Sequence, residues 1–316
     1  MVREMVKNHD IVISNRPRNI APSVILYDGN DVGFAPYGEY WKQARKISVV
    51  ELLSVKRVQE FQRMRDEENG RADEGDDGAV RSFQFRRFLS RFEWMDVVRG
   101  LSGRLKSASR KMDEFLDQVI EEHKANLVEK KDFVDILLRV QNQKDEILSS
   151  GLTQQDIKGI LADMFVAGAD TTSTVMEWLM AELVRNPEVM KKAQEESLDK
   201  HLRASNWEAT IFQQKPEEFI PERFENSDID FKGQDFQFSP FGTGRKGCPG
   251  MTFGITVKEY VIANLLYWFD WKLPGGALAK DLDMTEAHRL TVFKKHPFHL
   301  LPIPYNCSPS STSLAA

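Results

Sequence analysis

The chain contains the stretch Phe238-Ser-Pro-Phe-Gly-Thr-Gly-Arg-Lys-Gly-Cys-Pro-Gly250, and this stretch decides the expected fold. A single cysteine, Cys248, stands among four glycines, beside the cations Arg245 and Lys246, and before an apolar run that reaches Trp268. A thiol is mostly protonated near neutral pH at its unperturbed pKa of about 8.5, and it binds metal only as thiolate. The surroundings of this cysteine must therefore stabilise a negative sulfur.

The local pattern can supply that stabilisation. Pro249 suits the first turn of a helix, so the unpaired N–H groups at a helix start are expected beside Cys248. The glycines allow sharp turns and let the backbone approach a flat ligand closely. Arg245 and Lys246 offer positive charge to carboxylates on such a ligand. These features favour a thiolate held against a metal under an anionic ring.

Two other interpretations of this stretch have to be weighed. A free cysteine is most often a small buried residue, but core packing has no use for four glycines and two cations. The segment Gly242-Thr-Gly-Arg-Lys-Gly247 also matches the dinucleotide fingerprint G-x-G-x-x-G. That fingerprint needs a buried strand directly before it, and Pro240 cannot donate to a central ladder. A nicotinamide or flavin site is therefore disfavoured.

The segment from Phe241 to Gly250 resembles the haem-binding loop F-x-x-G-x-R-x-C-x-G of the cytochrome P-450 monooxygenases, in the form typical of plant microsomal members. The resemblance implies haem b (iron protoporphyrin IX), with Cys248 as the axial iron ligand, Phe241 packed near the sulfur, and dioxygen as co-substrate. At Lys246 the family has an arginine, so a bidentate propionate contact becomes a point-charge contact. The remaining loop residues expected to bind the cofactor are Gly244, Arg245 and Gly250.

A long apolar-rich run extends from Asp156 to about Arg185 and predicts a helix about 45 Å long. Thr153 and Asp156 are a candidate capping pair at its start, and Asn186-Pro187 is expected to stop it. Gly168 in the middle of a helix costs about 1 kcal/mol relative to alanine, so a local reason is expected. Room for a ligand is such a reason.

The segment from Ala167 to Thr171 resembles the oxygen-binding groove of the same family, in which an acid followed by a hydroxyl residue relays protons to dioxygen. A threonine hydroxyl can orient a water, and a carboxylate can connect that water to solvent. Asp170 and Thr171 are therefore the candidate catalytic residues. The alternative is that Thr171 and the hydroxyl residues after it only bond back to their own helix.

Trp41 and Arg45 are four residues apart and so share one face of a predicted helix. The resemblance assigns such a W-x-x-x-R pair to a haem propionate, although a surface stacking pair has the same spacing. Lys42, Arg45 and Lys46 make this region basic, which would suit the docking of an acidic reductase. An ordinary solvated face explains the charges equally well.

Three blocks of the family pattern are missing. Pro221-Glu-Arg-Phe224 matches the family's P-E-R-F segment, but Glu195 to Pro216 leaves no room for the upstream E-x-x-R helix. Residues 66–80 are acidic and glycine-rich where the family has several helices, and they predict a solvated linker. The chain opens with the helix-like segment Met1 to Asp10, with no apolar signal-like segment before it. We therefore expect a family member with internal gaps.

Composition sets the outer limits for the 316 residues. The formal net charge of -5 argues against a general nucleic-acid binder. Two cysteines, of which Cys307 lies in a tail (306–316) expected to be disordered, argue against a disulfide scaffold or a zinc site. No apolar run approaches the roughly 20 residues that span a bilayer, and the six histidines show no metal-site spacing. Helical periodicity predicts core positions at Leu105, Ala108, Met112, Phe115, Leu116, Val119 and Ile120.

Together these observations predict a mainly α protein with a minor β part, forming one monomeric cytochrome P-450-like domain over residues 1–316. The resemblance implies insertion of one oxygen atom from dioxygen into a hydrophobic small molecule of plant specialised metabolism, with electrons from an NADPH-dependent reductase. It also implies the cytosolic face of the endoplasmic reticulum membrane, although the chain as written lacks the anchor. The alternative is a catalytically inactive remnant of the family that binds haem weakly or serves only as an interaction surface.

Overall fold

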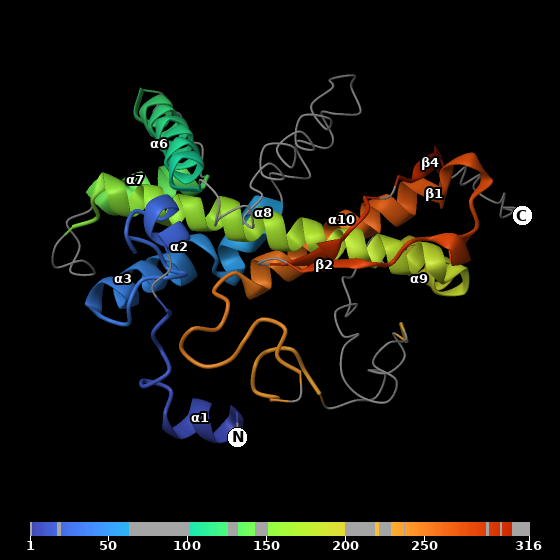
Figure 1. Cartoon of the computed structure of the whole chain (residues 1–316), viewed down its shortest axis with the longest axis horizontal. Helices are drawn as coiled ribbons and strands as arrows, with labels where there is room; N and C mark the ends of the chain where they lie inside the picture. Colours follow the sequence, from blue (N-terminus) through green and yellow to red (C-terminus); the bar gives the residue numbers. More distant parts are fainter. Residues whose placement is uncertain are drawn as a thin grey trace, which may run out of the picture. The chain divides into compact units, whose positions relative to one another are not determined.

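The structure, a computed structural model, describes residues 2–17, 20–62, 101–125, 132–142, 151–199, 219–220, 229–236, 238–288, 291–297 and 299–304. The described residues are mostly helical with two small antiparallel sheets (Figure 1), which confirms the mainly α fold with a minor β part. The predicted linker 66–80, the P-E-R-F segment 221–224 and the predicted tail 306–316 lie outside the described residues.

The backbone gathers into two compact units, each of which is described by itself. The first consists of Met1–Thr172 and Glu208–Ile255, and the second of Ser173–Trp207 and Thr256–Ala316. The grouping of the whole chain into one domain stays a prediction.

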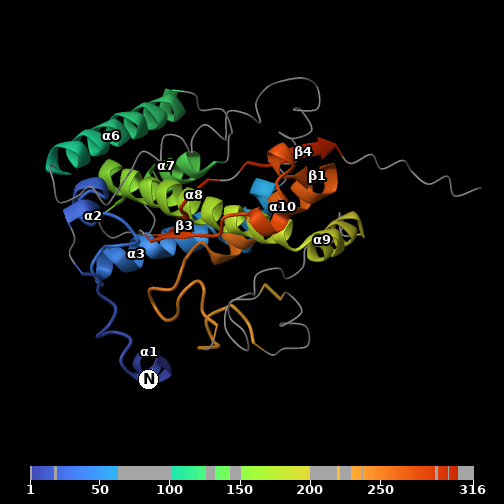
Figure 2. The same cartoon turned by 45° about the vertical axis from the view of Figure 1, so that its right-hand side comes forward.

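The first unit holds the helices that carry the candidate site. Its elements are α1 (Val2–Asn8), α2 (Ile20–Ile25), α3 (Glu39–Ile47), the π-helical turn η1 (Ser48–Leu52), α6 (Leu101–Ala125), α7 (Phe133–Asn142), the first part of α8 (Gln154–Arg185) and the start of α10 (Met251–Trp268). Figure 2 shows α6 and α7 beside the first part of α8. Lys158 of α8 bridges Asp113 and Asp117 of α6, both at 2.7 Å, which attaches the two helices to each other.

The limits of α8 follow from local chemistry, as predicted. The Thr153 hydroxyl accepts a hydrogen bond from the Asp156 N–H (3.1 Å), and the Asp156 carboxylate accepts one from the Thr153 N–H (2.9 Å). This reciprocal pair satisfies two N–H groups that a helix start would leave open. At the other end, α8 stops at Arg185, and Pro187 opens α9 (Pro187–Asp199). The predicted helix from Asp156 to about Arg185 is confirmed.

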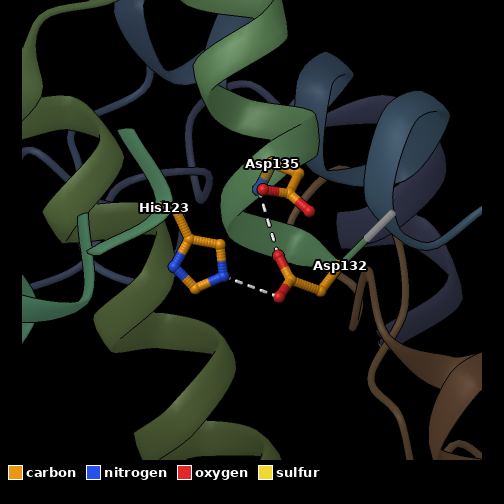
Figure 3. A group of neighbouring side chains, drawn as sticks. All are labelled: His123, Asp132 and Asp135. Atoms are coloured by element: carbon orange, nitrogen blue, oxygen red, sulfur yellow. Dashed lines mark hydrogen bonds and ion pairs between the residues drawn. The ribbon is translucent and has the colours of Figure 1, made fainter. Parts of the chain in front are cut away.

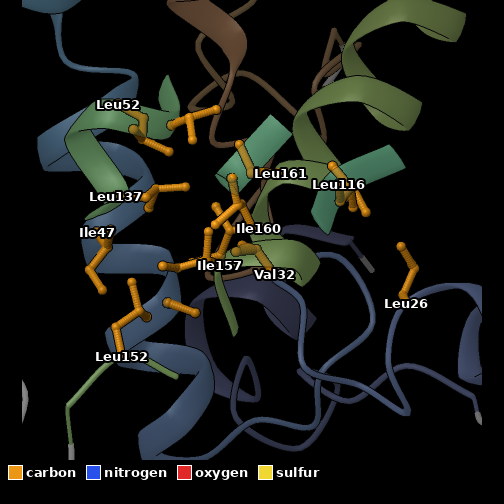
Figure 4. Packing of buried hydrophobic residues seen from close by; sticks show 14 of the residues in the cluster. Leu26, Val32, Ile47, Leu52, Leu116, Leu137, Leu152, Ile157, Ile160 and Leu161 are labelled. Carbon is orange, nitrogen blue, oxygen red and sulfur yellow. The ribbon is translucent and has the colours of Figure 1, made fainter. Parts of the chain in front are cut away.

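The core of the first unit lies among α3, η1, α6, α7 and α8. Figure 4 shows its branched aliphatic side chains packed together, and at about 1.5–3 kcal/mol for each fully buried side chain they dominate the stability of the unit. Of the positions predicted on α6, Leu105, Met112, Leu116 and Ile120 are buried. Phe115 is exposed, so that prediction is wrong: the helix buries a narrow stripe, and Phe115 lies at its edge against the partly buried Phe165. The largest fully buried side chains of this core are Ile47, Leu52, Leu116, Ile120, Ile136, Leu137, Ile157, Ile160 and Leu161.

A histidine joins the end of α6 to the start of α7 (Figure 3). His123 Nε2 lies 2.8 Å from an Asp132 carboxylate oxygen, and His123 Nδ1 lies 2.7 Å from the Val119 carbonyl oxygen. The Val119 carbonyl oxygen and a carboxylate oxygen can only accept, so both contacts are hydrogen bonds when the ring is doubly protonated. The other Asp132 oxygen accepts the N–H groups of Val134 (3.0 Å) and Asp135 (3.1 Å) and thereby caps α7.

Through these contacts His123 and Asp132 act as a clamp between α6 and α7. His123, Asp132 and Asp135 offer ligand atoms within 4.8 Å of one another, an arrangement that the sequence did not indicate. Burial lowers the pKa of His123, but the hydrogen bonds to Asp132 and Val119 outweigh it, and the net effect is a raised pKa. Both ring nitrogens of His123 and both oxygens of the Asp132 carboxylate already have hydrogen-bond partners.

We expect His123 to make stability depend on pH. Because its pKa is raised in the folded protein, its contribution is complete below the unfolded pKa of about 6.5 and is lost as the pH rises through the folded pKa. His123→Ala should cost about 1 kcal/mol in mildly acidic solution and much less in alkaline solution. Urea unfolding at several pH values tests this, with Lys124→Ala on the same turn as control. A cost that does not change with pH would contradict the clamp.

The second unit combines helices with the two sheets. It holds the rest of α8, α9, the rest of α10, the strands β1 (Phe269–Lys272), β2 (Glu286–His288), β3 (Val292–Lys294) and β4 (Leu301–Pro304), and the 3-10 turns η4 (Pro274–Gly276) and η5 (Ala279–Asp281). Strand β1 pairs antiparallel with β4, with Phe269 opposite Pro304, and β2 pairs antiparallel with β3. Among the described residues, no helix combines the length and apolar character needed to cross a bilayer.

Candidate active site

The cysteine loop closes on itself through its own backbone. The Cys248 N–H donates to the Phe241 carbonyl oxygen (2.8 Å), and the Gly247 N–H donates to the Gly244 carbonyl oxygen (3.1 Å). Gly242 and Gly244 have φ of 73° and 69°, a left-handed conformation that side chains rarely adopt. The glycines are therefore needed for the turn, and the turn leaves the Cys248 side chain exposed.

The sulfur lies at the start of α10. The Gly254 N–H donates to the Gly250 carbonyl oxygen (2.8 Å), so the first turn of the helix forms directly after Cys248. The N–H groups of such a turn and the helix dipole favour a thiolate over a thiol. A Cβ at Gly250 would lie 4.0 Å from the Cys248 Sγ and 4.0 Å from Leu53, which is ordinary van der Waals contact. Gly250 is therefore next to the sulfur.

Two cations lie against the ring of the buried Trp41. The Arg45 guanidinium is 5.4 Å and the Lys246 Nζ is 4.3 Å from the ring centroid. Arg45 donates to the Gly247 carbonyl oxygen (2.8 Å), and Lys246 donates to the Ala35 carbonyl oxygen (2.7 Å). Both are partly buried, and within the described ranges neither forms an ion pair. The Arg45 guanidinium thus stacks on Trp41, as the alternative interpretation allowed, and Lys246 joins it. The assignment of Trp41 and Arg45 to a haem propionate stays a prediction.

The electrostatics of this cluster suit an anionic ligand. Burial lowers the pKa of Lys246 to about 8, and Arg16 and Arg45 act in the same direction. Burial also lowers the pKa of Arg45, whereas the adjacent Cys248 acts to raise it. A ligand carboxylate at this place would relieve the repulsion between the cations and replace their neutral carbonyl partners. The residues therefore fit the propionate side of a haem.

Arg245 points to a different neighbour. Its Nε lies 2.7 Å from an Asp10 carboxylate oxygen, and its guanidinium lies 5.6 Å from the centre of the Tyr37 ring. A Cβ at Gly244 would approach the same Asp10 carboxylate to 2.8 Å, so the glycine lets Asp10 come close. No local pattern in the sequence pointed to Asp10, because the pairing joins residues far apart in the chain. The assignment of Arg245 to the cofactor stays a prediction.

The candidate oxygen groove lies on α8. The Thr171 hydroxyl donates to the Ala167 carbonyl oxygen (2.7 Å), as the alternative interpretation expected, and its side chain is exposed. Asp170 is partly exposed beside it. No described atom lies within 4 Å of a Cβ built on Gly168, so this part of the helix is open. The predicted space at Gly168 is present.

In the site as a whole, the structure brings Trp41, Arg45, Lys246 and Cys248 together, and it leaves Asp170 and Thr171 on a separate element. Phe241 contributes its carbonyl oxygen to the loop, while its ring packs against Phe231 at 6.4 Å. An exposed sulfur at a helix start, with cations gathered beside it, defines the class of a thiolate-ligated cofactor site.

Comparison with known proteins agrees with this class. The family model described as cytochrome P-450 matches residues 59–209 and 201–301. Phenylacetaldehyde oxime monooxygenase of Prunus mume is 38% identical over 421 aligned positions, which cover 97% of this chain and 80% of that protein. Cytochrome P-450 71A1 of Persea americana is 35% identical over 416 positions, covering 95% and 82%. A solved zebrafish cytochrome P-450 with progesterone has a TM-score of 0.72 at 18% identity over 96% of this chain and 92% of that one, and so shares the fold.

The chain belongs to the cytochrome P-450 family. It is thus an oxidoreductase by family, with haem as cofactor and dioxygen as co-substrate. The alignment with the Prunus mume protein has 421 positions although the chain has 316 residues, so this chain has no residue at many of them. The family model also matches the chain in two separate segments, which overlap at residues 201–209. This overlap lies between Glu195 and Pro216, where the E-x-x-R helix was found to be missing. The expected internal gaps are therefore present.

Proposed function

We propose that this chain is a haem-thiolate monooxygenase that inserts one oxygen atom from dioxygen into a hydrophobic small molecule. The observation that carries the proposal is the exposed Cys248 side chain at the start of α10, with Arg45 on the neighbouring loop carbonyl. Haem, when bound, supplies the iron chemistry that activates dioxygen.

The chain's own residues hold the cofactor from the sulfur side. Cys248 would bind the iron through its sulfur, and the start of α10 favours the thiolate. Arg45 and Lys246 would bind the propionates in place of their present carbonyl partners, while the Trp41 ring supports both cations. The other members of the binding loop are Phe241, Gly244, Arg245 and Gly250.

Proton delivery falls to α8. The Thr171 hydroxyl already donates its proton to the Ala167 carbonyl oxygen, so its lone pairs remain able to accept a hydrogen bond from a water. Asp170, which directly precedes Thr171 in the chain and is partly exposed, can exchange protons with solvent. Together they would hold a water beside the Thr171 hydroxyl and pass protons to it.

The substrate is a small hydrophobic molecule of plant specialised metabolism. The similar plant proteins include a phenylacetaldehyde oxime monooxygenase, a desmethylyatein synthase and a strychnine-11-hydroxylase, whose names point to several chemical classes. Their variety supports the broad class and does not single out one molecule. The electrons come from NADPH through a separate reductase, at the cytosolic face of the endoplasmic reticulum as in related enzymes.

The basic face of α3 is the proposed docking site for that reductase. Lys42 is engaged with Glu39 at 2.6 Å in an exposed pair, which adds little stability. Lys46 is exposed on the same helix. A charged face of this kind affects the rate of association more than the affinity. Association with the reductase should therefore slow as the salt concentration rises.

Labelled dioxygen tests the proposed reaction. The full chain, loaded with haem and mixed with a plant NADPH-dependent reductase, is offered a panel of small aromatic and terpenoid molecules under labelled dioxygen. The proposal predicts one labelled oxygen atom per product molecule, and no product from the Cys248→Ala variant. Haem uptake without product over the whole panel would count against the proposal.

The second candidate is an inactive remnant of the family. It is favoured by the gaps in the alignment and by the division of the family match into two segments, which overlap at residues 201–209. In that case the protein binds haem weakly or acts only as an interaction surface. Its signature in the same experiment is NADPH consumption no faster than that of the reductase alone.

A further inference from the structure

The turn of residues 31–35 is a junction between α8 and α3. On one side of it, the Asp163 carboxylate of α8 accepts hydrogen bonds from the N–H groups of Val32 (2.6 Å) and Gly33 (3.2 Å). On the other side, the carbonyl oxygen of Val32 accepts a hydrogen bond from the Trp41 Nε1 of α3 (2.9 Å). A single residue, Val32, thus connects the two helices that carry the candidate site.

The cysteine loop is attached to the same turn. Lys246 donates to the carbonyl oxygen of Ala35 at 2.7 Å. Inside the turn, Asp31 has no exposed surface, and one of its oxygens accepts a hydrogen bond from the Phe34 N–H. The other oxygen is buried and, within the part of the chain that the structure describes, has no hydrogen-bond partner. A buried carboxyl oxygen in this state costs free energy unless a proton or a cation serves it.

The two carboxyl groups, Asp31 and Asp163, lie beside one glycine. A Cβ built on Gly33 would be 3.3 Å from an Asp163 oxygen and 3.6 Å from an Asp31 oxygen. A methyl group on Gly159, one turn earlier on α8, would overlap the Asn30 carbonyl oxygen, so the helix backbone presses directly on this turn. Asp31 is fully buried and Asp163 is partly buried, and neighbouring carboxyl groups in such a place resist ionising together, because each negative charge raises the pKa of the other.

The charged groups around the pair agree with one retained proton. Burial first, and then the charge of Asp31, raises the pKa of Asp163 to about 7, whereas its backbone donors and Lys246 act in the opposite direction. Burial likewise raises the pKa of Asp31. Burial first, and then the charges of Asp156, Asp31 and Asp163, raise the pKa of Tyr40, so its hydroxyl stays neutral.

The position of Asp163 on α8 connects the pair to the oxygen groove. Asp163 and Asp170 are seven residues apart, which is two helical turns or about 10 Å along one face of the helix. Fixing Asp163 on the turn 31–35 therefore fixes the rotation of the helix that presents Asp170 and Thr171.

We propose that Asp163 is a positioning residue that shares one proton with Asp31 and holds α8 on the turn of residues 31–35. Through this turn it sets the arrangement of the groove helix, of Trp41 and of Lys246. The consequence for the cofactor rests on the proposed function, whereas the carboxyl pair rests on the contacts alone.

The first test uses the full chain without haem. With a folded pKa of about 7 and an ordinary value of 3.8, Asp163 keeps a proton that the unfolded chain releases, so the pair makes stability fall as the pH rises between these values. Asp163→Asn keeps the shape of the side chain and an oxygen that accepts the hydrogen bond from the Val32 N–H, but its amide does not titrate in this pH range. Its unfolding temperature, relative to that of the unaltered chain, should therefore rise as the pH goes from about 5 to about 8. An unchanged difference between the two proteins over this range would overturn the shared proton.

The second test measures haem retention by transfer to an excess of apomyoglobin. Asp163→Ala removes both acceptor contacts, and we expect haem loss about tenfold faster than from the unaltered chain. Asp163→Asn should lose haem about as slowly as the unaltered chain. The control is Asp117→Asn, which weakens another attachment of α8 through Lys158 without touching the turn. Equal retention in Asp163→Ala and the unaltered chain would overturn the positioning role.

The two tests separate this inference from the proposed function. If the full chain takes up no haem, the proposed function fails, and the unfolding measurement still decides whether the carboxyl pair exists. If haem is bound and the pH effect is absent, the proposed function stands and the pair is refuted.

Discussion

Cys248→Ala abolishes the thiolate-type Soret band of the reduced protein treated with carbon monoxide. The loss should be complete, because the sequence has one other cysteine, Cys307, and it is far from the loop along the chain, in the predicted tail. At the start of α10, Cys248 is the one side chain of the loop that offers a thiolate to iron. The measurement is the difference spectrum between the reduced protein with and without carbon monoxide.

Two controls make this result specific. Cys307→Ala should keep the band, because the substitution removes a thiol without touching the loop. Thermal unfolding of Cys248→Ala should stay close to that of the unaltered apoprotein, because the replaced side chain is exposed. A band that survives in Cys248→Ala would refute the assignment of the axial ligand.

Of the two glycine-to-alanine substitutions that α8 allows, Gly159→Ala should lower the stability of the protein far more than Gly168→Ala. The new methyl group would overlap the carbonyl oxygen of Asn30, a backbone atom that cannot rotate away, so the helix and the turn have to separate. We expect a loss of about 3 kcal/mol or more in the free energy of unfolding, which is at the upper end for overpacking. Urea unfolding of the apoprotein measures it.

The same helix provides the matched control. No described atom lies within 4 Å of a Cβ built on Gly168, and alanine is the better helix former by about 1 kcal/mol. Gly168→Ala should therefore leave the apoprotein as stable as before or slightly more stable. Equal free energies of unfolding for Gly159→Ala and Gly168→Ala would show that α8 does not lie as close to the Asn30 carbonyl oxygen as described.

Features coded by neighbouring residues could be predicted from the sequence. The limits of α8 were predicted because Thr153 and Asp156 cap each other and Pro187 cannot continue the helix. The Trp41 and Arg45 contact was predicted because residues four apart share a helical face. The open position at Gly168 was predicted because a glycine in the middle of a helix needs a local reason.

Features made by residues far apart in the chain could not be predicted. Arg245 forms an ion pair with Asp10, a residue with no marked local pattern. Phe115 fits the helical period, yet the stripe that α6 buries is too narrow to include it. Asp31 and Asp163 look like ordinary solvated acids in the sequence, and only the fold places them beside one glycine.

The most direct test of the proposed function is the reduced, carbon-monoxide-treated spectrum of the unaltered full chain after incubation with haem. A cysteine presented by the start of α10 and cations gathered at Trp41 predict stoichiometric uptake of haem and a thiolate-type Soret band. No uptake of haem, or a bound haem without that band, would contradict the assignment of this chain as a haem-thiolate enzyme.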